Sequence, residues 1–464
     1  MPHHAQKPSP ARTPPSHVPG GPAVDRWSLV AVAGMLSFVA MLDMNIVTVA
    51  LADISRSLNV SPATAQWALL GYQLPVVALL LPIGRWLDGA AGLRPALLAA
   101  TAGFAVCSMA AAAAPWAAWL IGARACQGVF AAVLFVLMPV LAARSVRPEL
   151  RARALSVPAT CGPLGAVTGP AVGGILLDHL GWRAVLLVKL PFCIAALVAA
   201  RRAMPRDGRL RAPDRRSLAD AALVGTALAA VLLALTLAPG APAWLLLATA
   251  AAPPLALWLR GPGGRTFTAA LRESRMHGAY GAVLTLAAGF AATRYAVALH
   301  LQQDDGVSAT TTGLTVLAFP LGMGLAGPLG GRLATRFGPR PVAVSGAAIT
   351  TLGLGLLLPL GETLSPPEVA WRLALAGIGM GLYGGPAQAL VMGAAPPGRA
   401  ATAASTIQLS RQLGFALGPA LAAALWGSAG QAHGVQAALA LAAAAAGLAI
   451  PLLALRHQRF ARTG

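Results

Sequence analysis

Long apolar stretches, separated by short polar segments, run along almost the whole chain. Each stretch holds about 18–25 residues, which is enough for an α-helix to cross a bilayer core of roughly 30 Å. The pattern predicts fourteen membrane-spanning helices, at residues 27–49, 64–86, 94–113, 117–142, 152–177, 182–200, 217–237, 243–259, 277–301, 311–333, 341–360, 370–392, 400–426 and 434–455.

The composition supports a chain that lies mostly in a membrane. Hydrophobic residues make up 57% of the 464 residues and charged residues only 10%, whereas a soluble domain has about 25% charged residues. The first apolar stretch is long enough to span, so we do not interpret it as a cleaved signal peptide. The predicted organisation is a disordered tail at 1–26, an N-terminal six-helix bundle at 27–202, a basic loop with two extra spans at 203–275, a C-terminal six-helix bundle at 276–456 and a tail at 457–464.

The net charge of +20 reflects topology and does not indicate nucleic-acid binding. With a cytoplasmic N-terminus, 27 of the 34 Lys and Arg residues lie in or beside the cytoplasmic segments. Arg56, Arg183 and Arg372 lie on the outer side, and Arg124, Lys189, Arg294 and Arg411 lie within spans. The densest run, "RRAMPRDGRLRAPDRR" at 201–216, then also lies inside. This asymmetry follows the positive-inside rule, and an even number of spans places both termini in the cytoplasm.

Two pairs of similar segments indicate an internal repeat. "LGAVTGPAVGG" (164–174) returns as "LGFALGPALAA" (413–423), 249 residues later. "GRWLDGAAGLRP" (84–95) returns as "GRLATRFGPRP" (331–341), 247 residues later. Two homologous halves account for six spans each, so spans seven and eight are extra. Internal repeats with a site at their interface are common in secondary transporters, which alternate access by rocking one half against the other.

Four motifs in order resemble the major facilitator superfamily and, within it, the fourteen-span drug:proton antiporter branch. "LDMNIVTVAL" (42–51) is similar to the motif of the first span in that branch, and "RACQGVFAA" (124–132) to the Arg-x-x-Gln-Gly motif of the fourth. "GAVTGPAVGG" (165–174) matches the antiporter motif of the fifth span, and "RQLGFALG" (411–418) resembles the Arg-Gln-x-Gly stretch of the thirteenth. The resemblance covers nearly the full chain. It implies an all-α membrane protein with the major facilitator fold, in which two six-helix bundles flank two extra helices.

The resemblance also implies a set of residues that control the conformational change. Glycines let helices approach closely, and a proline removes an internal hydrogen bond and permits bending. Static packing of small residues and a solvated loop remain alternative interpretations. The loop after the second span departs from the family pattern, because Gly89 replaces an Arg, and a weakened conformational latch is the expectation. The predicted gating residues are Gly84, Arg85, Asp88, Gly165, Gly169, Pro170, Gly173 and Gly174.

Asp43 is an acid in the middle of a span, where a charge costs about 2.5–3.5 kcal/mol even on lenient insertion scales. At 1.5 Å per residue it lies about 24 Å from the inner end of its span, and Arg124 lies roughly 10 Å below the outer end of the fourth. The two side chains therefore share a depth and can offset each other's desolvation. We interpret them as the proton-coupling pair, in which the carboxylate binds a proton on one side and releases it on the other. A structural salt bridge is the alternative.

Other polar residues of the spans are candidates for the substrate cavity. They are Asn45, Gln127, Lys189, Gln302, Arg411 and Gln412. For Lys189, where the resembling family usually has Asn, and for Arg294, snorkelling to the outer interface is an equal alternative. Four cations and one well-buried acid disfavour a polycationic drug and leave neutral, weakly basic or anionic compounds open.

These features together predict a proton-coupled exporter of small amphipathic compounds in the inner membrane of a bacterium. The expected partners are protons, the lipid bilayer and the small-molecule substrate, and the expected state is a monomer. The proton motive force takes the place of a cofactor, and no metal is expected, because the four cysteines lack metal-ligand spacing. An exporter of a self-made metabolite fits the same sequence. An enzyme would need a nucleophile–base or metal constellation, and a sensor would need a signalling domain for which the tails are too short.

Overall fold

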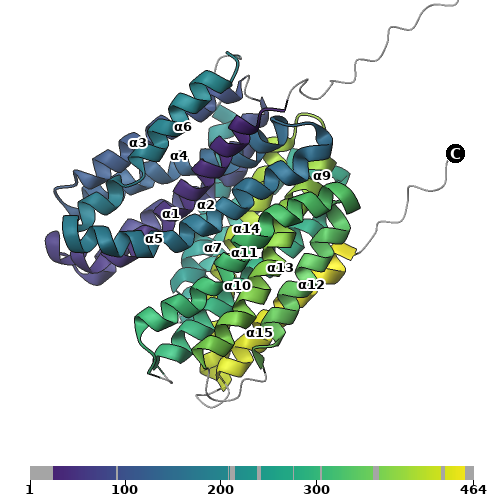
Figure 1. Ribbon diagram of the computed structural model, residues 1–464. Coiled ribbons are helices and arrows are strands. Elements are labelled where there is room, and N and C mark those ends of the chain that lie inside the picture. The colour runs from purple at the N-terminus through teal and green to yellow at the C-terminus, as the bar shows by residue number, and fades with distance from the viewer. Residues whose placement is uncertain are drawn as a thin grey trace, which may run out of the picture.

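The computed structural model describes residues 25–89, 92–206, 208, 215–237, 242–274, 276–303, 306–358, 365–429 and 434–454 (Figure 1). The described residues form helices and contain no strand. The prediction of an all-α fold built from two six-helix halves with extra helices between them is confirmed. Residues 1–24 and 455–464, which include the predicted C-terminal tail and all but the last two residues of the predicted N-terminal tail, lie outside the described part of the chain.

The first half, coloured purple to blue in Figure 1, packs α1 mainly against α5 and packs α2 and α3 against α4. Long apolar runs explain these helices, since each exceeds the length that a bilayer core requires. The helices of this half are α1 (Trp27–Ser57), α2 (Pro62–Gly89), α3 (Leu93–Ala112), α4 (Ala117–Arg144), the short 3₁₀ helix η1 (Pro148–Leu150), α5 (Arg151–Leu187) and α6 (Leu190–Ala203).

The connection between the halves contains four helices among the described residues. It consists of α7 (Arg215–Leu237), the 3₁₀ helix η2 (Pro242–Ala251), α8 (Ala252–Arg260) and α9 (Pro262–Ser274). Together η2 and α8 extend about 33 Å, given 2.0 and 1.5 Å per residue, so the segment predicted as the eighth span is helical and is divided between a 3₁₀ helix and an α-helix. The polar helix α9 is not predicted by the sequence, because its residues lie in the 203–275 region but outside both predicted extra spans. It packs against α8, where the rings of Trp258 and Phe267 lie 5.5 Å apart.

The second half, green to yellow in Figure 1, repeats the arrangement of the first. Here α10 packs against α14 and α15, as α1 packs against α5 and α6. The helices are α10 (His277–Gln303), α11 (Ala309–Phe337), α12 (Pro339–Gly355), α13 (Pro366–Ala394), α14 (Ala400–Ala429) and α15 (Gly434–Ala454). This correspondence agrees with the repeated segments in the sequence.

Within the described residues, eight helical stretches are long and apolar enough to cross a membrane by length and composition. One of them, Pro148–Ala203, covers both the fifth and the sixth predicted span. Two shorter apolar helices, Leu218–Val231 and Leu246–Arg260, belong to the connection between the halves. Helices α13 and α14 are of spanning length but contain more glycine and polar residues.

Arginine contacts gather the loops at one end of the bundle, which we call the basic end. Arg26 donates to the carbonyl of Ala203 at 3.5 Å, and Arg94 donates to the carbonyl of Arg201 at 3.2 Å. The backbone and side chain of Arg147 donate to the carboxylate of Asp25, and these hydrogen bonds lower the pKa of that carboxyl. The basic end is the end that the charge rule places in the cytoplasm.

The boundary between the fifth and sixth predicted spans differs from the expectation of a loop at 178–181. The chain is helical on both sides of this boundary and kinks at Gly181, whose backbone is not helical and whose φ of +76° is in the region that favours glycine. The sixth span is itself interrupted, because α5 ends at Leu187 and α6 begins at Leu190. Pro191 lies in the first turn of α6, where its missing N–H costs no helical hydrogen bond. Lys189 therefore lies at a helix break rather than within a continuous span.

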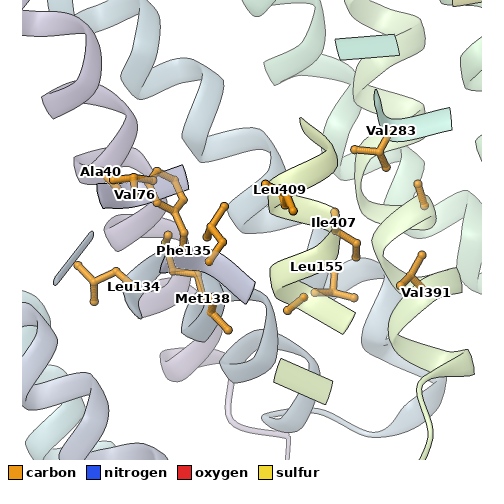
Figure 2. Packing of buried hydrophobic residues seen from close by; sticks show 14 of the residues in the cluster. Ala40, Val76, Leu134, Phe135, Met138, Leu155, Val283, Val391, Ile407 and Leu409 are labelled. Atoms are coloured by element: carbon orange, nitrogen blue, oxygen red, sulfur yellow. The ribbon is translucent and has the colours of Figure 1, made fainter. Parts of the chain in front are cut away.

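The two halves meet through α2 against α14 and through α5 against α11 and α13. Their apolar cores are continuous in this region. Figure 2 shows Phe135 and Met138 of α4 and Leu155 of α5 near Ile407 of α14 and Val391 of α13. A separate apolar cluster, which includes Leu42, Ile46 and Trp182, lies in the first half toward the end opposite the basic end. The core thus joins the halves near the basic end.

Candidate functional site

A cluster of three buried charges lies in the first half. The guanidinium Nη1 of Arg124 donates to Oδ2 of Asp43 at 2.8 Å, and the ammonium of Lys189 donates to the other carboxylate oxygen of Asp43. All three side chains have 0% solvent exposure. The cluster therefore ties α1, α4 and the break before α6 together around one carboxylate.

Lys189 is the member of this cluster that sequence reasoning missed. The sequence predicts a place in the substrate cavity or at the outer interface for Lys189, whereas the structure buries the side chain completely against Asp43. A usable signal was present, since Lys189 and Arg124 each lie within roughly 10 Å of the outer end of their spans at 1.5 Å per residue. Lys189 itself lies between α5 and α6 with helical backbone angles, a φ of −80° and a ψ of −14°.

Arg124 makes further contacts that hold its guanidinium in place. Nε donates to the carbonyl of Ala68 at 3.1 Å, and Nη1 also donates to Oε1 of Gln127 at 2.8 Å. The guanidinium carbon lies 4.4 Å from the ring centroid of Tyr72. Among the described residues, Nη2 of Arg124, Nε2 of Gln127 and the hydroxyl of Tyr72 have no hydrogen-bond partner. Buried hydrogen-bond donors beside the charged cluster are therefore not satisfied by the described residues.

With all three groups ionised, the cluster carries a net charge of +1. Charges in a low-dielectric interior interact much more strongly than in water, so each ionised member depends on the others. A guanidinium group is not deprotonated in proteins, whereas a carboxylate can bind a proton and an ammonium can release one. The cluster can therefore change its net charge by one proton.

The remaining residues predicted for the substrate cavity do not form one group. Asn45 donates from Nδ2 to the carbonyl of Met41 at 2.8 Å. Gln302 is exposed and is the second-last residue of α10. Arg411 and Gln412 lie on α14, where Arg411 donates to Oε1 of Gln408 at 2.8 Å. Residues of the described part form no cluster of three or more His, Cys, Asp or Glu side chains suited to a metal ion.

The glycines of α5 face α1, inside the first half. A Cβ on Gly165 would collide with the carbonyl of Phe38, and one on Gly169 would lie 3.2 Å from the carbonyl oxygen of Leu42. A Cβ on Gly173 would lie 2.8 Å from Cγ1 of Ile46. Pro170 is exposed, and a Cβ on Gly174 would meet nothing within 4 Å. The motif therefore sets the distance between α5 and the helix that carries Asp43.

The opposite side of α5 contacts the second half. A Cβ on Gly324 of α11 would lie 2.9 Å from Leu164, and one on Gly331 would lie 2.7 Å from Oγ of Ser156. A Cβ on Gly385 of α13 would lie 2.7 Å from Cβ of the same serine. Helix α5 thus connects the charged cluster, through α1, to the interface between the halves.

The Gly169→Leu variant is expected to reach the membrane in near-normal amount and to lose transport. The leucine must push α5 away from the backbone of α1, but it adds no charge or polar group that would hinder insertion. The measurement is initial efflux rate per amount of protein in the membrane. Gly174→Leu is the matched control, because its side chain enters open space and should leave the rate unchanged. Normal efflux by Gly169→Leu would reduce the motif to static packing.

The last turn of α2, predicted as a loop, contacts the start of α14 at the basic end. The carboxylate of Asp88 accepts hydrogen bonds from the backbone N–H groups of Ala401 at 2.8 Å and Thr402 at 2.9 Å, and from the Thr402 hydroxyl at 2.5 Å. These amides belong to the first turn of α14, where N–H groups lack helical partners and favour an anion. The contact forms although Gly89 replaces the family's Arg.

The other two residues predicted in this loop also have defined places. A Cβ on Gly84 would lie 2.7 Å from Cβ of Ser405, so the glycine lets α2 approach α14. Arg85 pairs with Asp220 of α7 and so links the end of α2 to the extra helices. We call the contacts of Gly84 and Asp88 with α14 the basic-end latch.

The Asp88→Ala variant is expected to open the basic-end latch. Loss of a helix-capping side chain costs about 0.5–2 kcal/mol, which shifts a two-state equilibrium by roughly 2- to 30-fold. Ser405 is fully buried here, so a Ser405→Cys reporter in a background without native cysteines should react faster with a maleimide when Asp88 is Ala. Asp53→Ala, at the opposite end of the bundle, should leave the labelling rate unchanged. Equal rates with Asp88→Ala would show that the contact does not hold the halves together.

Two known proteins are similar in sequence to most of this chain. The Probable actinorhodin transporter of Streptomyces coelicolor is 29% identical over 425 residues, which cover 87% of this chain and 73% of that protein. The drug efflux pump JefA of Mycobacterium tuberculosis is 30% identical over 411 residues, which cover 84% of this chain and 78% of that protein. Both relatives are named as transporters.

Solved structures share the fold at low sequence identity. The human organic anion transporter MFSD10 (TETRAN) superposes with a TM-score of 0.65 at 18% identity, covering 92% of this chain and 99% of that one. A bacterial homologue of ferroportin in its outward-facing state gives 0.66 at 14% identity, covering 92% and 98%. The family model described as Major Facilitator Superfamily matches residues 33–271 and 279–463. With both halves matched and the expected fold in place, this chain belongs to the Major Facilitator Superfamily.

Proposed function

We propose that this chain is a proton-coupled exporter of small amphipathic compounds, of the fourteen-span drug:proton antiporter type. The observation that carries the proposal is the fully buried carboxylate of Asp43 between the cations of Arg124 and Lys189. Intramembrane ionisable groups are costly and mark proton or substrate pathways in transporters. The name of the relative JefA, a drug efflux pump, supports export as the direction.

The exchanged proton belongs to Asp43 and Lys189 together. Release of a proton from Lys189 takes the cluster from a net charge of +1 to neutral, whereas protonation of Asp43 beside two cations would take it to +2. Strongly coupled groups of this kind titrate as a pair. The ion-paired arrangement seen here, with the lysine ammonium on the carboxylate, corresponds in our proposal to the proton-loaded state.

Alternating access in this proposal works by rocking of the two halves. The basic-end latch and the packing of α5 on α11 join the halves near the basic end, which supports assigning this conformation as closed toward the cytoplasm. The cluster would then load its proton from the outer side and release it after the latch opens inward. Each proton that enters supplies about 2.3 kcal/mol per 100 mV of membrane potential. One chain contains both halves, so the proposed unit is a monomer.

Export of a self-made metabolite is the second candidate. It is favoured by the name of the relative from Streptomyces coelicolor, a probable transporter of actinorhodin. The charged cluster and the latch serve either cargo equally well. A panel of drugs tested in a host without its own efflux pumps would separate the two, because resistance is expected only from a drug exporter.

The test of proton coupling uses purified protein in vesicles with an imposed pH gradient. A fluorescent cargo should accumulate against its own gradient only while the pH gradient lasts, and a proton-exchanging ionophore should abolish the accumulation. Accumulation that continues after the ionophore is added would contradict proton coupling.

Both termini and the segment at 201–216 are proposed to lie in the cytoplasm of the bacterium, beneath its inner membrane. A reporter fusion at Gly208 is expected to read cytoplasmic, because the dense arginine run around it strongly disfavours translocation. A fusion at Gly464, which lies outside the described residues, should give the same reading. A periplasmic reading at Gly464 alone would mean an odd number of spans.

A further inference from the structure

Three phenylalanine rings from three helices form a cluster in the second half. Phe290 of α10 stacks on Phe319 of α11 with ring centroids 4.1 Å apart and an angle of 27° between the rings. Phe415 of α14 lies edge-on to Phe290, with centroids 6.2 Å apart. Phe319 is fully buried, whereas Phe290 and Phe415 are partly accessible. The cluster offers an apolar aromatic surface at the junction of these helices.

Two of the helices that carry these rings, α10 and α14, also each carry an arginine close to its ring in sequence. The guanidinium carbon of Arg294 is 5.6 Å from the ring centroid of Phe290, and the residue is exposed. Arg411 is four residues before Phe415 on α14, and residues at this spacing are neighbours on one helix face. Its Nη1 donates to Oε1 of Gln408, and the buried hydroxyl of Tyr383 nearby has no hydrogen-bond partner among the described residues.

No carboxylate of the described residues pairs with Arg294 or Arg411. At 1.5 Å per residue, Arg294 lies about 25 Å from the start of α10, toward the far side of a core of roughly 30 Å, and Arg411 lies about 16 Å from the start of α14, near the middle of that core. Charged groups at such depth are normally paired or line a water-filled cavity. Among the described residues, Asp43 is the one carboxylate in the middle of a span, and it already pairs with two cations in the other half. These two arginines therefore lack a counter-ion that the described protein could supply.

From this arrangement we infer that the cargo is an aromatic organic anion. Its ring system lies on Phe290 and Phe415, and its acidic group pairs with the guanidinium groups of Arg294 and Arg411. Guanidinium binds carboxylates in a planar, two-point geometry, and it combines this with aromatic stacking. A permanently cationic compound would meet two like charges in the same place, which disfavours its binding. This inference rests on the proposed export of amphipathic compounds and names the chemical class within it.

The test compares two dyes that share a xanthene ring system but differ in charge, fluorescein (anionic) and rhodamine 123 (cationic). Fluorescence anisotropy with purified protein measures binding directly and does not depend on proton coupling. Fluorescein is expected to bind at least tenfold more tightly than rhodamine 123. Arg294→Gln and Arg411→Gln should each weaken fluorescein binding about tenfold. Arg294 is exposed, so its replacement should not disturb folding.

Arg372→Gln is the matched control, because Arg372 pairs with Glu368 near the start of α13 and should not contact cargo. Tighter binding of rhodamine 123, no saturable binding of fluorescein, or unchanged fluorescein binding in both glutamine variants would each overturn the inference. A separate measurement, accumulation of the dye in vesicles under a pH gradient, tests proton-coupled export and not binding. Saturable fluorescein binding without gradient-driven accumulation would count against proton-coupled export while the anion site stands.

Discussion

In vesicles with an imposed pH gradient, the Asp43→Asn variant is expected to lose uphill accumulation of cargo completely. Asparagine keeps the size and hydrogen bonding of the side chain but does not titrate. Asp43 is the acceptor for both Arg124 and Lys189, so no other described carboxylate can replace it in the cluster. The variant should still exchange cargo down its gradient, because rocking of the halves does not itself require the charge.

A charge-matched variant separates lost coupling from lost folding. Asp43→Asn alone leaves two buried cations without an anion, and the removal of one partner from a buried ion pair typically costs about 3–5 kcal/mol. Asp43→Asn combined with Lys189→Met keeps the net charge of +1 and removes every titrating group of the cluster. The double variant should therefore be closer to wild type in thermal stability and should equally fail to accumulate cargo.

The control for this experiment is Asp53→Asn on the same helix. Asp53 pairs with Arg56, whose side chain is 79% exposed, near the end of α1. Exposed ion pairs contribute about 0–1 kcal/mol, so this variant should accumulate cargo as wild type does. Gradient-driven accumulation by Asp43→Asn at the wild-type rate would contradict the proposal and leave Asp43 as part of a structural ion cluster.

Simultaneous replacement of Arg124 and Lys189 by Met is expected to destabilise the protein far more than the sum of the two single replacements. Each single variant leaves Asp43 with one cation and therefore keeps a neutral buried pair. The double variant leaves a carboxylate without a partner in the membrane, and an uncompensated buried charge costs about 3–5 kcal/mol. The measurement is the thermal unfolding midpoint of detergent-purified protein in a double-mutant cycle.

Arg183→Met, near the end opposite the basic end, is the control for the loss of a cation. Its guanidinium contacts the ring of Trp182 at 4.4 Å and the carbonyl of Ala114, and the site has no buried acid. This variant should shift the midpoint only slightly. Strict additivity of the Arg124 and Lys189 replacements would mean that the two cations do not share Asp43 as their partner.

Several features of this protein could be predicted from local sequence patterns. The lengths of apolar runs predicted the helices, and two repeats at nearly one spacing predicted the two halves, because both signals depend only on order along the chain. The rise of 1.5 Å per residue placed Asp43 and Arg124 at one depth, and the structure places them 2.8 Å apart. Depth along the membrane normal is thus readable from the sequence.

The sequence could not predict which way each helix faces. A helix that is apolar on all sides carries no periodic signal for its rotation, so its orientation depends on packing with every neighbour. The glycines of α5 were therefore identified, but the structure was needed to place Gly165, Gly169 and Gly173 against α1. For the same reason, the sequence could not predict that the rings of Phe290 and Phe415 contact each other or that Arg294 lies over the ring of Phe290.

By itself, the sequence determined the membrane-embedded all-α class, the two halves, the resemblance to the family and the pairing depth of Asp43 and Arg124. That Lys189 joins them is visible only in the packed structure, because the contact depends on how the segment between α5 and α6 packs against α1 and α4. The structure alone likewise decided that Asp88 caps α14 more than 300 residues away. Spacing along one chain sets what each helix contains, whereas contacts between distant helices arise only when all of them pack together.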